Sequence, residues 1–271
     1  MAEKTVKIFE GRDFGIERKI DSKPNIIDFE LHNHDDLYEV LLLLGGDCEF
    51  CVEGNTYRLE AHDIIFTRPF ELHKMACLSE KTYDRIILYI KSDYFKNNNC
   101  GEFLDIFENR PLGTGNRISR DIANRALRDC MNRMYLYAEE KAYDVLEKVI
   151  FEFLYLINDS REMADTFYVK DERVRKMIMY INGNLAENLS LDMLSKEFFV
   201  AKNYMCRIFK KHTGYTINRY ISNKRIMLAQ ELHRNGQNLM QASLNAGFNS
   251  YANFYKAYVK QIGKSPRGMN G

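Results

Sequence analysis

The sequence predicts an α+β protein of two domains, a β-rich domain over residues 1–165 and an all-α domain over residues 166–271. Three observations predict this division. Two helix-turn-helix patterns stand in tandem near the C-terminus, and short strand-like runs between residues 31 and 90 are separated by turns every eight to twelve residues. The third is a charge that differs in sign between the two parts, in a chain whose 271 residues suit two domains of ordinary size.

The charge is unevenly distributed along the chain. From Lys170 to Gly271 there are 17 lysine and arginine residues and 6 aspartate and glutamate residues, a formal charge of +11. The preceding residues carry 22 basic and 32 acidic residues, a formal charge of −10. Positive charge gathered in one domain is typical of a protein that binds a polyanion such as DNA. The acidic domain would be repelled by DNA, so we expect a different role for it.

Composition also indicates where the chain works. No apolar run approaches the ~20 residues of a membrane helix, and the N-terminus lacks the apolar core of a signal peptide. We therefore expect a cytoplasmic chain with no membrane partner, whose six cysteines are reduced thiols. Cys48 and Cys51 have the spacing of a redox pair, but in a strand such positions point to opposite faces, which favours a structural role.

The elements of the β-rich domain follow in order. Residues 1–30 contain only short extended pieces, such as 5–9, which we expect to open this domain. The following strands are expected at residues 38–44, 48–52, 56–59, 64–67, from 73 onward, and 86–90. Turn residues separate these runs, including Gly45-Gly46 and Glu53-Gly54-Asn55. Such spacing predicts a β-sandwich or a small barrel.

Two stretches of this domain resemble the two halves of a cupin barrel motif. They are His32-x-His34-x4-Glu39-x6-Gly46 and Asp63-x5-Pro69-x3-His73. The second half departs from the enzyme pattern, because His62 replaces its usual first glycine and the spacing from proline to histidine is one residue short. Strand alternation puts His32 and His34 on one face. With Glu39 and His73 they would form a set of ligands suited to iron, manganese or zinc.

Helices are expected after the strands. A short helical piece at residues 103–107 and a turn at 111–115 precede two long helices, from Ser119 to about Glu139 and from about Ala142 to Asn158. The second is apolar on nearly all sides and needs a partner to bury it. That partner could be a second copy of the chain, or both helices could only cover the barrel. A polar linker at 159–170 and a helix at 172–185 follow.

The first helix-turn-helix pattern begins at Ser190, an N-cap residue, with a supporting helix to about Phe198. The second helix spans residues 201–212 and ends at Gly214. Its packing half is expected to comprise Tyr204, Met205, Ile208, Phe209 and His212. Its open half is expected to comprise Lys202, Asn203, Cys206, Arg207, Lys210 and Lys211.

The second helix-turn-helix pattern repeats this construction downstream. Its supporting helix is expected at residues 239–246 and its turn at Gly247-Phe248. Ser250 caps a helix with Phe254, Ala257, Tyr258 and Ile262 on its apolar half and Ala252, Asn253, Lys256 and Lys260 on its open half. A helix from Thr216 to Arg234, roughly 28 Å long, joins the two patterns. That length predicts that both recognition helices enter successive major grooves, which lie ~34 Å apart.

The C-terminal 100 or so residues resemble the DNA-binding domain of AraC-type transcription regulators. The residues that carry the resemblance are Phe209-Lys210-Lys211-x-x-Gly214, Tyr220-x4-Arg225-x3-Ala229, Gly247-Phe248-x-Ser250-x3-Phe254 and Gly263-x-Ser265-Pro266. The resemblance implies a homodimer that associates through the helical segment at about 118–158, and double-stranded promoter DNA and RNA polymerase as partners. It also implies a small-molecule effector in the N-terminal domain, with no catalytic residues.

These inferences name two sets of residues. The expected DNA-binding residues are Lys202, Asn203, Cys206, Arg207, Lys210, Lys211, Asn249, Ser250, Ala252, Asn253 and Lys256. The expected effector-binding residues are His32, His34, Tyr38, Glu39, Arg58, Arg68 and His73, around a polar molecule such as a sugar. For the histidines we favour this polar lining, without a resident metal or cofactor. The alternatives are a metal-dependent cupin enzyme with an appended helical domain, and an architectural DNA-binding protein without an effector.

Overall fold

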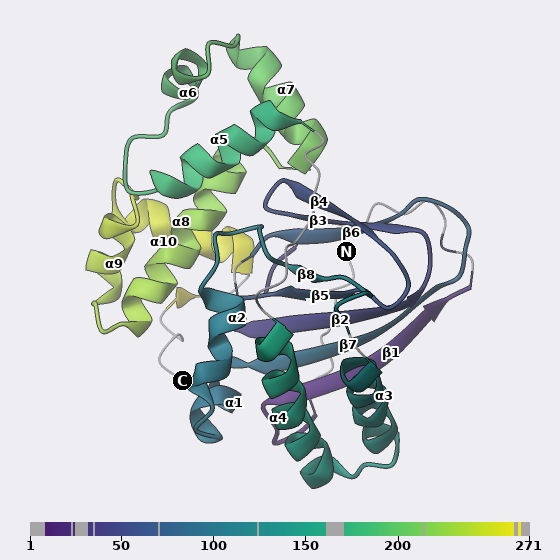
Figure 1. Cartoon of the computed structure of the whole chain (residues 1–271). Coiled ribbons are helices and arrows are strands. Elements are labelled where there is room, and N and C mark those ends of the chain that lie inside the picture. The colour runs from purple at the N-terminus through teal and green to yellow at the C-terminus, as the bar shows by residue number, and fades with distance from the viewer. Residues whose placement is uncertain are drawn as a thin grey trace. The chain divides into compact units, whose positions relative to one another are not determined.

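The computed structural model describes residues 9–22, 24, 32–34, 36–69, 71–123, 125–160, 171–213, 215–262 and 265–266. The chain divides into two compact units, Met1–Val169 and Lys170–Gly271 (Figure 1). The extended piece expected at residues 5–9 and the linker expected at 159–170 lie almost entirely outside the described residues. Within the described part of the chain, no helix is both long and apolar enough to span a membrane.

The first unit is built on two antiparallel sheets. The larger sheet has the strand order β1-β7-β2-β5-β8 and the smaller has the order β4-β3-β6. The larger sheet contains β1 (Phe14–Asp21), β2 (Leu37–Gly45), β5 (Ile64–Thr67), β7 (Tyr83–Lys91) and β8 (Arg117–Ile118). The smaller sheet contains β3 (Cys48–Val52), β4 (Asn55–Leu59) and β6 (His73–Cys77). The turn spacing predicts a β-sandwich or a small barrel, and the structure has two sheets that enclose a shared core.

The sequence predicted opening strands within residues 1–30 but not the bounds of β1, and it did not predict strand β8. In β1, Phe14 and Ile16 alternate into the core, but the remainder of the strand is mostly polar. It becomes a strand because all eight of its residues pair with β7. Strand β8 has two residues and pairs with Ile64 and Ile65 of β5. Both are edge strands, which depend on their neighbours more than on their own pattern.

Successive residues of each strand point to opposite faces of the larger sheet and form one hydrophobic core on each face. Between the sheets lie Leu41, Leu43, Cys48, Phe50, Val52, Tyr57, Leu59, Ile65, Met75, Cys77, Tyr83, Ile87 and Tyr89, all buried. The opposite face of the larger sheet packs against helices through the intervening residues of the strands, such as Val40, Leu42 and Leu88. The larger sheet is therefore buried on both faces, which explains the continuous apolar run at 40–44.

The helices on the outer face follow strand β7 in the sequence. They are α1 (Ser92–Asn97), the 3-10 helix η1 (Gly101–Leu104), α2 (Asp105–Glu108), α3 (Arg125–Glu139) and α4 (Tyr143–Asp159). Figure 1 shows α3 and α4 side by side near β1 and β7. The prediction that the first long helix begins at Ser119 is wrong. Residues 119–123 form a turn in which the Ser119 carbonyl accepts hydrogen bonds from the backbone N–H groups of Ile122 and Ala123.

The cysteines confirm that Cys48 and Cys51 do not form a redox pair. Cys48 faces the interior, with its Sγ 3.8 Å from the Sγ of Cys77 on the neighbouring strand. The Sγ of Cys51 lies 3.1 Å from the Oγ1 of Thr56. Burial raises the pKa of the Cys48 and Cys77 thiols, which disfavours the reactive thiolate.

Helices are the regular secondary structure of the second unit in its described residues. Its helices are α5 (Glu172–Gly183), α6 (Leu191–Glu197), α7 (Lys202–Thr213), α8 (Ile217–Arg234), α9 (Leu239–Asn245) and α10 (Tyr251–Ile262). The side chains of Ser190, Thr216 and Ser250 each accept a hydrogen bond from the backbone N–H three residues later, as the capping signals predict. The glycine expected to end α7, Gly214, lies outside the described residues.

Arg225 of α8 joins segments from both halves of the second unit. Its Nε donates to the carbonyl oxygen of Leu185 at 2.8 Å, and its Nη2 donates to that of Glu187 at 2.6 Å. These carbonyls lie between α5 and α6. Gly247, in the turn after α9, packs against the same guanidinium with a φ of +94°. The two helix-turn-helix motifs are therefore held on α8 through one arginine.

Candidate functional site

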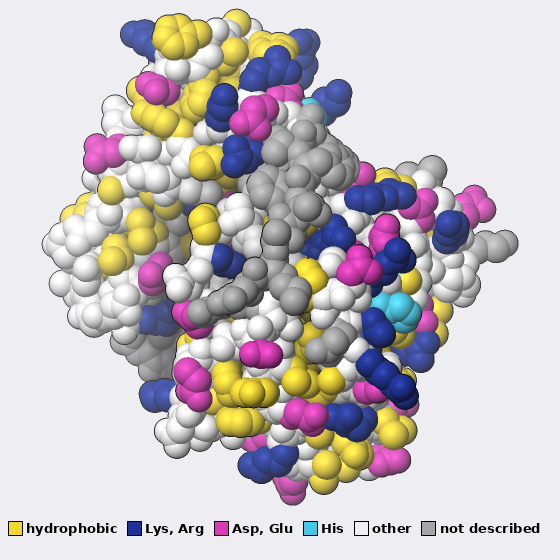
Figure 2. Space-filling view, viewed as in Figure 1, with side chains coloured by type: hydrophobic (Ala, Val, Ile, Leu, Met, Phe, Trp, Pro, Cys, Tyr) yellow, Lys and Arg dark blue, Asp and Glu magenta, His cyan; other side chains and the backbone are white. Residues whose placement is uncertain are grey.

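Helix α7 divides into a buried and an exposed half. Met205, Ile208 and Phe209 are buried, and Tyr204 and His212 are partly buried. Lys202, Asn203, Arg207, Lys210 and Lys211 are exposed, and Cys206 is partly exposed. The structure confirms the division that helical periodicity predicts. Figure 2 shows lysine and arginine side chains gathered on the surface around α7.

Helix α10 is divided in the same way. Phe254 and Tyr258 are buried in a core with Ile226, Ala229 and Ala246. On the open side Asn249, Ala252, Asn253, Lys256 and Lys260 are exposed, and Ser250 is partly exposed. The side chain of Ile262, expected on the apolar half, is outside the described residues. The open half of α10 thus offers polar and basic groups, as that of α7 does.

Two aromatic and ionic contacts position the basic groups of α7. Lys202 Nζ lies 2.5 Å from Asp192 Oδ1 on α6, and both side chains are largely exposed. The Arg207 guanidinium lies over the Tyr204 ring, 5.7 Å from its centroid. Exposed ion pairs contribute at most about 1 kcal/mol, so Asp192 holds the Lys202 ammonium only weakly. The stacked guanidinium of Arg207 is held at the helix surface.

The structure gathers four of the seven expected effector-binding residues at one end of the sandwich. Glu39 at the start of β2 lies opposite Thr67 at the end of β5 and Tyr89 near the end of β7. His73 begins β6, and His32 pairs with it through two backbone hydrogen bonds of 3.0 and 2.9 Å. His34 completes the set, with ring centroids 5.3 Å from His32 and 5.6 Å from His73. We call His32, His34, Glu39 and His73 the histidine cluster.

Hydrogen bonds fix the orientation of two of the imidazoles. His34 Nε2 lies 2.8 Å from Glu39 Oε2. His73 Nδ1 lies 2.8 Å from the carbonyl oxygen of Glu71, and because a carbonyl only accepts, Nδ1 carries the proton. His73 Nε2 is buried and has no hydrogen-bond partner among the described residues. The His73 ring also stacks on Phe50, with an interplanar angle of 25°.

The pKa directions within the histidine cluster follow from burial and from these contacts. Burial by itself raises the pKa of Glu39, but the hydrogen bond from His34 and the neighbouring imidazoles lower it well below its usual range. Burial lowers the pKa of His73. Near neutral pH the histidine cluster therefore contains a carboxylate and a neutral His73 imidazole.

The other three expected effector-binding residues lie elsewhere. The Tyr38 hydroxyl donates to Glu108 Oε1 at 2.7 Å, on the opposite face of β2 from Glu39. Arg68 Nη1 lies 3.3 Å from Glu108 Oε2. Arg58 is exposed on β4 and pairs with Asp47. Strand parity explains the separation of Tyr38 from the histidine cluster, because neighbouring residues of a strand point to opposite faces.

Glu71 is a buried structural anchor beside these residues. Its Oε1 and Oε2 accept hydrogen bonds of 2.8 and 2.7 Å from Arg110. They also accept from the Gly113 backbone and the Asn116 amide, at 2.8 and 3.0 Å. Although burial raises the Glu71 pKa, the Arg110 charge and these hydrogen bonds lower it to about 2. Glu71 thus fixes the loop before β8.

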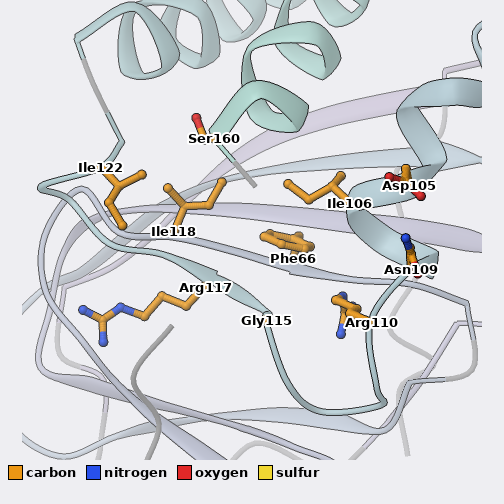
Figure 3. Close-up of a pocket in the computed structure, with 10 residues that line it drawn as sticks. All are labelled: Phe66, Asp105, Ile106, Asn109, Arg110, Gly115, Arg117, Ile118, Ile122 and Ser160. Carbon is orange, nitrogen blue, oxygen red and sulfur yellow. The ribbon is translucent and has the colours of Figure 1, made fainter. Parts of the chain in front are cut away.

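A pocket of about 130 Å³ lies on the outer face of the larger sheet, away from the histidine cluster. Figure 3 shows its lining residues, Phe66, Asp105, Ile106, Asn109, Arg110, Gly115, Arg117, Ile118, Ile122 and Ser160. Its two arginines are engaged in ion pairs, Arg110 with Glu71 and Arg117 with Asp63. Its volume is below the ~300–1,000 Å³ of typical ligand pockets. The histidine cluster is the stronger candidate site, because the buried Nε2 of His73 has no hydrogen-bond partner among the described residues.

Sequence patterns did not reveal some residues beside these sites. Thr67, Tyr89 and Phe50 adjoin the histidine cluster, and the parity of their strands would place them on the inner face once register is known. The contact of Arg225 with Gly247 was not foreseen either. Both residues belong to the motifs that carry the resemblance, but their spacing gives no sign that they touch.

Comparison with known proteins assigns a family to each unit. A family model described as an AraC-like ligand binding domain matches residues 16–111, which include Glu39 and His73 of the histidine cluster. A model described as a helix-turn-helix domain matches residues 194–270, which include α7 and α10. The two models match separate units and leave the helices α3 and α4 between them.

Individual relatives agree with these models over most of the chain. The chain is 21% identical over 240 residues to YdiP, an uncharacterized HTH-type transcriptional regulator of Escherichia coli (strain K12), covering 87% of this chain and 78% of the relative. It is 20% identical over 251 residues to the HTH-type transcriptional activator RhaS of Escherichia coli (strain SMS-3-5 / SECEC), covering 89% and 87%. A solved structure of ToxT from Vibrio cholerae is 13% identical, with a TM-score of 0.39, covering 94% and 97%. The chain belongs to the AraC-type transcription regulators, with a ligand-binding domain followed by a helix-turn-helix DNA-binding domain.

Proposed function

We propose that this regulator recognises a specific promoter sequence and that a small polar effector bound at the histidine cluster controls it. The proposal of promoter recognition rests on the similar division of α7 and α10 into a buried and an exposed half. Each buries its apolar half in the second unit and exposes a polar and basic half of the size that a major groove admits. We infer further that α8, with 18 residues and a length of roughly 27 Å, spaces the two helices for successive grooves.

The exposed residues of these helices divide into base-reading and phosphate-binding groups. Arg207 can donate two hydrogen bonds to guanine, and Asn203 can form a pair of hydrogen bonds with adenine. Asn253 is the corresponding base-reading residue of α10. Cys206, Asn249, Ser250 and Ala252 border the same surfaces. Lys202, Lys210, Lys211 and Lys256 would neutralise phosphates, which contributes affinity without sequence preference.

Arg207→Ala is expected to weaken binding to the specific promoter site by ~1–3 kcal/mol and to relax sequence preference, because a bidentate base contact is lost. Lys211→Ala should weaken specific and random DNA alike and lower the salt dependence by about one phosphate contact. Both are measured by fluorescence anisotropy on a site identified by footprinting the region upstream of the gene. Lys176→Ala, which removes an exposed lysine of α5, is the control. Equal losses on specific and random DNA for both variants would contradict these roles.

The effector is proposed to be a polar metabolite, such as a sugar, because the histidine cluster offers imidazole and carboxylate groups at the end of an otherwise apolar interior. The footprint is repeated with and without metabolites of the neighbouring genes' pathways. A metabolite that changes the footprint supports control by an effector. An unchanged footprint across the panel supports an architectural DNA-binding protein instead.

Helices α3 and α4 are proposed to form a homodimer interface. Their buried faces cover the larger sheet, but Leu136, Val145 and Tyr155 leave 53%, 48% and 59% of their surface exposed. Figure 2 shows hydrophobic side chains on the surface of this unit. RNA polymerase is the further partner that we propose, as expected of a regulator that acts at promoters.

If α3 and α4 form the dimer interface, substitutions on their exposed side chains should change the mass of the particle in solution. The unaltered chain should run as a dimer, and Leu136→Glu combined with Tyr155→Glu should shift it to a monomer, because each chain would bury two charges in the interface. Size-exclusion chromatography with light scattering measures the mass. Met179→Glu, at a residue of α5 that is 57% exposed, is the matched control and should remain dimeric. A doubly substituted chain that keeps the dimer mass would rule out this interface.

A further inference from the structure

We propose that His32, His34, Glu39 and His73 hold one divalent ion of a first-row transition metal. Each residue offers one ligand atom, and these atoms all lie within 4.8 Å of one another. Ligand atoms bound to one ion at ~2.1 Å lie about 3.0–3.4 Å apart when they are neighbours in an octahedral or a tetrahedral site. Side-chain movements of about an ångström would therefore bring all four onto one ion.

The strongest support comes from His73. Its Nδ1–H donates to the Glu71 carbonyl oxygen at 2.8 Å, so its Nε2 presents a lone pair. That Nε2 lies 3.9 Å from Glu39 Oε2, is buried, and has no hydrogen-bond partner among the described residues. A buried polar atom without a partner destabilises the folded chain, and a metal bond would remove that penalty. A ring nitrogen fixed by a backbone carbonyl on its far side is also the usual arrangement of a metal-binding histidine.

The surroundings of the histidine cluster give independent support. Thr67 lies directly opposite Glu39, and its buried Oγ1 also has no hydrogen-bond partner among the described residues. A water molecule bound to the metal could donate to this oxygen. The ion would join three segments, because His32 and His34 precede β2, Glu39 lies in β2 and His73 begins β6.

The donor set limits the choice of ion. Three imidazoles and one carboxylate, without a thiolate, suit Mn²⁺, Fe²⁺, Co²⁺, Ni²⁺ or Zn²⁺, whereas Ca²⁺ and Mg²⁺ prefer sets made of oxygen alone. Four protein ligands leave further positions open on an ion that takes five or six ligands. The proposal goes beyond the proposed function, because binding of an ion requires neither DNA nor an effector.

The test uses the full chain purified without a polyhistidine tag. After removal of metals with a chelator, the chain is titrated with Zn²⁺, Mn²⁺ and Co²⁺ by calorimetry, and the metal content is measured after gel filtration. We expect one ion per chain for at least one of these metals, and a rise in Tm because the ion binds the folded state. Bound Co²⁺ should show the visible absorption of nitrogen and oxygen ligands.

Two variants separate a loss of ligands from a loss of folding. His34→Gln keeps a hydrogen-bonding group for Glu39 but removes an imidazole, and it should weaken binding at least tenfold while the circular dichroism spectrum is unchanged. His62→Asn removes an exposed histidine of the same unit, at a φ of +78° that asparagine tolerates, and should bind as the unaltered chain does. Absence of stoichiometric binding for all three metals would overturn the proposal, and so would equal affinities for the two variants. DNA binding by the metal-free chain, measured in parallel, tests the proposed function separately.

Discussion

Gly247→Ala is expected to destabilise the second unit by about 4 kcal/mol and to abolish DNA binding. Gly247 has a φ of +94°, a conformation that costs a residue with a Cβ ~1–2 kcal/mol. A Cβ at this position would lie 2.2 Å from the Leu185 carbonyl oxygen and 2.8 Å from Arg225 Nε. The backbone would have to move, which overpacks the junction and disrupts the hydrogen bonds of Arg225 to Leu185 and Glu187.

Gly236→Ala is the matched control for this prediction. Gly236 has the same φ of +94°, but a Cβ there would meet nothing within 4 Å. It should therefore show the conformational cost alone, about 1–2 kcal/mol. Urea unfolding, with hydrogen exchange resolved by peptide over residues 172–262, measures both variants. Similar losses for the two would show that the contact of Gly247 with Arg225 does not hold the two motifs together.

Glu71→Ala is expected to destabilise the first unit by about 3–5 kcal/mol, because it leaves the Arg110 charge buried without its partner. The guanidinium side chain of Arg110 is 8% exposed and that of Glu71 is fully buried. The substitution also removes the acceptor for the backbone N–H of Gly113. Urea unfolding followed by hydrogen exchange over residues 37–159 measures the loss. Glu60→Ala, at an exposed carboxylate paired with the exposed Arg120, should cost less than about 1 kcal/mol.

The same carboxylate gives the first unit a defined acid sensitivity. The Glu71 pKa is lowered to about 2, whereas an unfolded glutamate titrates near ~4.3. The unfolded chain therefore takes up this proton first, so the stability that Glu71 contributes is present above pH ~4.3 and is lost as the pH falls toward about 2. The free energy of unfolding should fall over this range more steeply for the unaltered chain than for Glu71→Gln. Equal slopes would show that folding does not lower the pKa of Glu71.

Local physics accounts for what could be predicted about the helices. Helix ends depend on residues within one turn, so Ser190, Thr216 and Ser250 marked the starts of α6, α8 and α10 correctly. The buried and exposed sides of α7 and α10 follow from a repeat of 3.6 residues, which does not depend on what the helix packs against. The start of α3 could not be predicted from nearby residues. Its turn at 119–123 is fixed partly by Asp63, whose carboxylate accepts from the Arg120 backbone, far away in sequence.

The effector site shows the limit of the same reasoning. Alternation correctly grouped His32 and His34, but Tyr38 differs from Glu39 by one residue and therefore faces the helices, where it bonds to Glu108. A phase error of one residue moves a side chain to the other face of the sheet. Arg68 and Arg58 lie in or beside strands whose partners the sequence did not identify.

The sequence by itself determined the two-domain order, most of the helices and strands, the basic character of the second unit, and the exposed halves of its recognition helices. These properties depend on composition and on periodicities that extend over a few residues. The tertiary structure alone decided that Tyr38 faces the helices and bonds to Glu108, that Glu71 is enclosed by the loop before β8, and that Gly247 contacts Arg225. Contacts between distant residues depend on strand register and packing distance, and no local pattern in the chain encodes either.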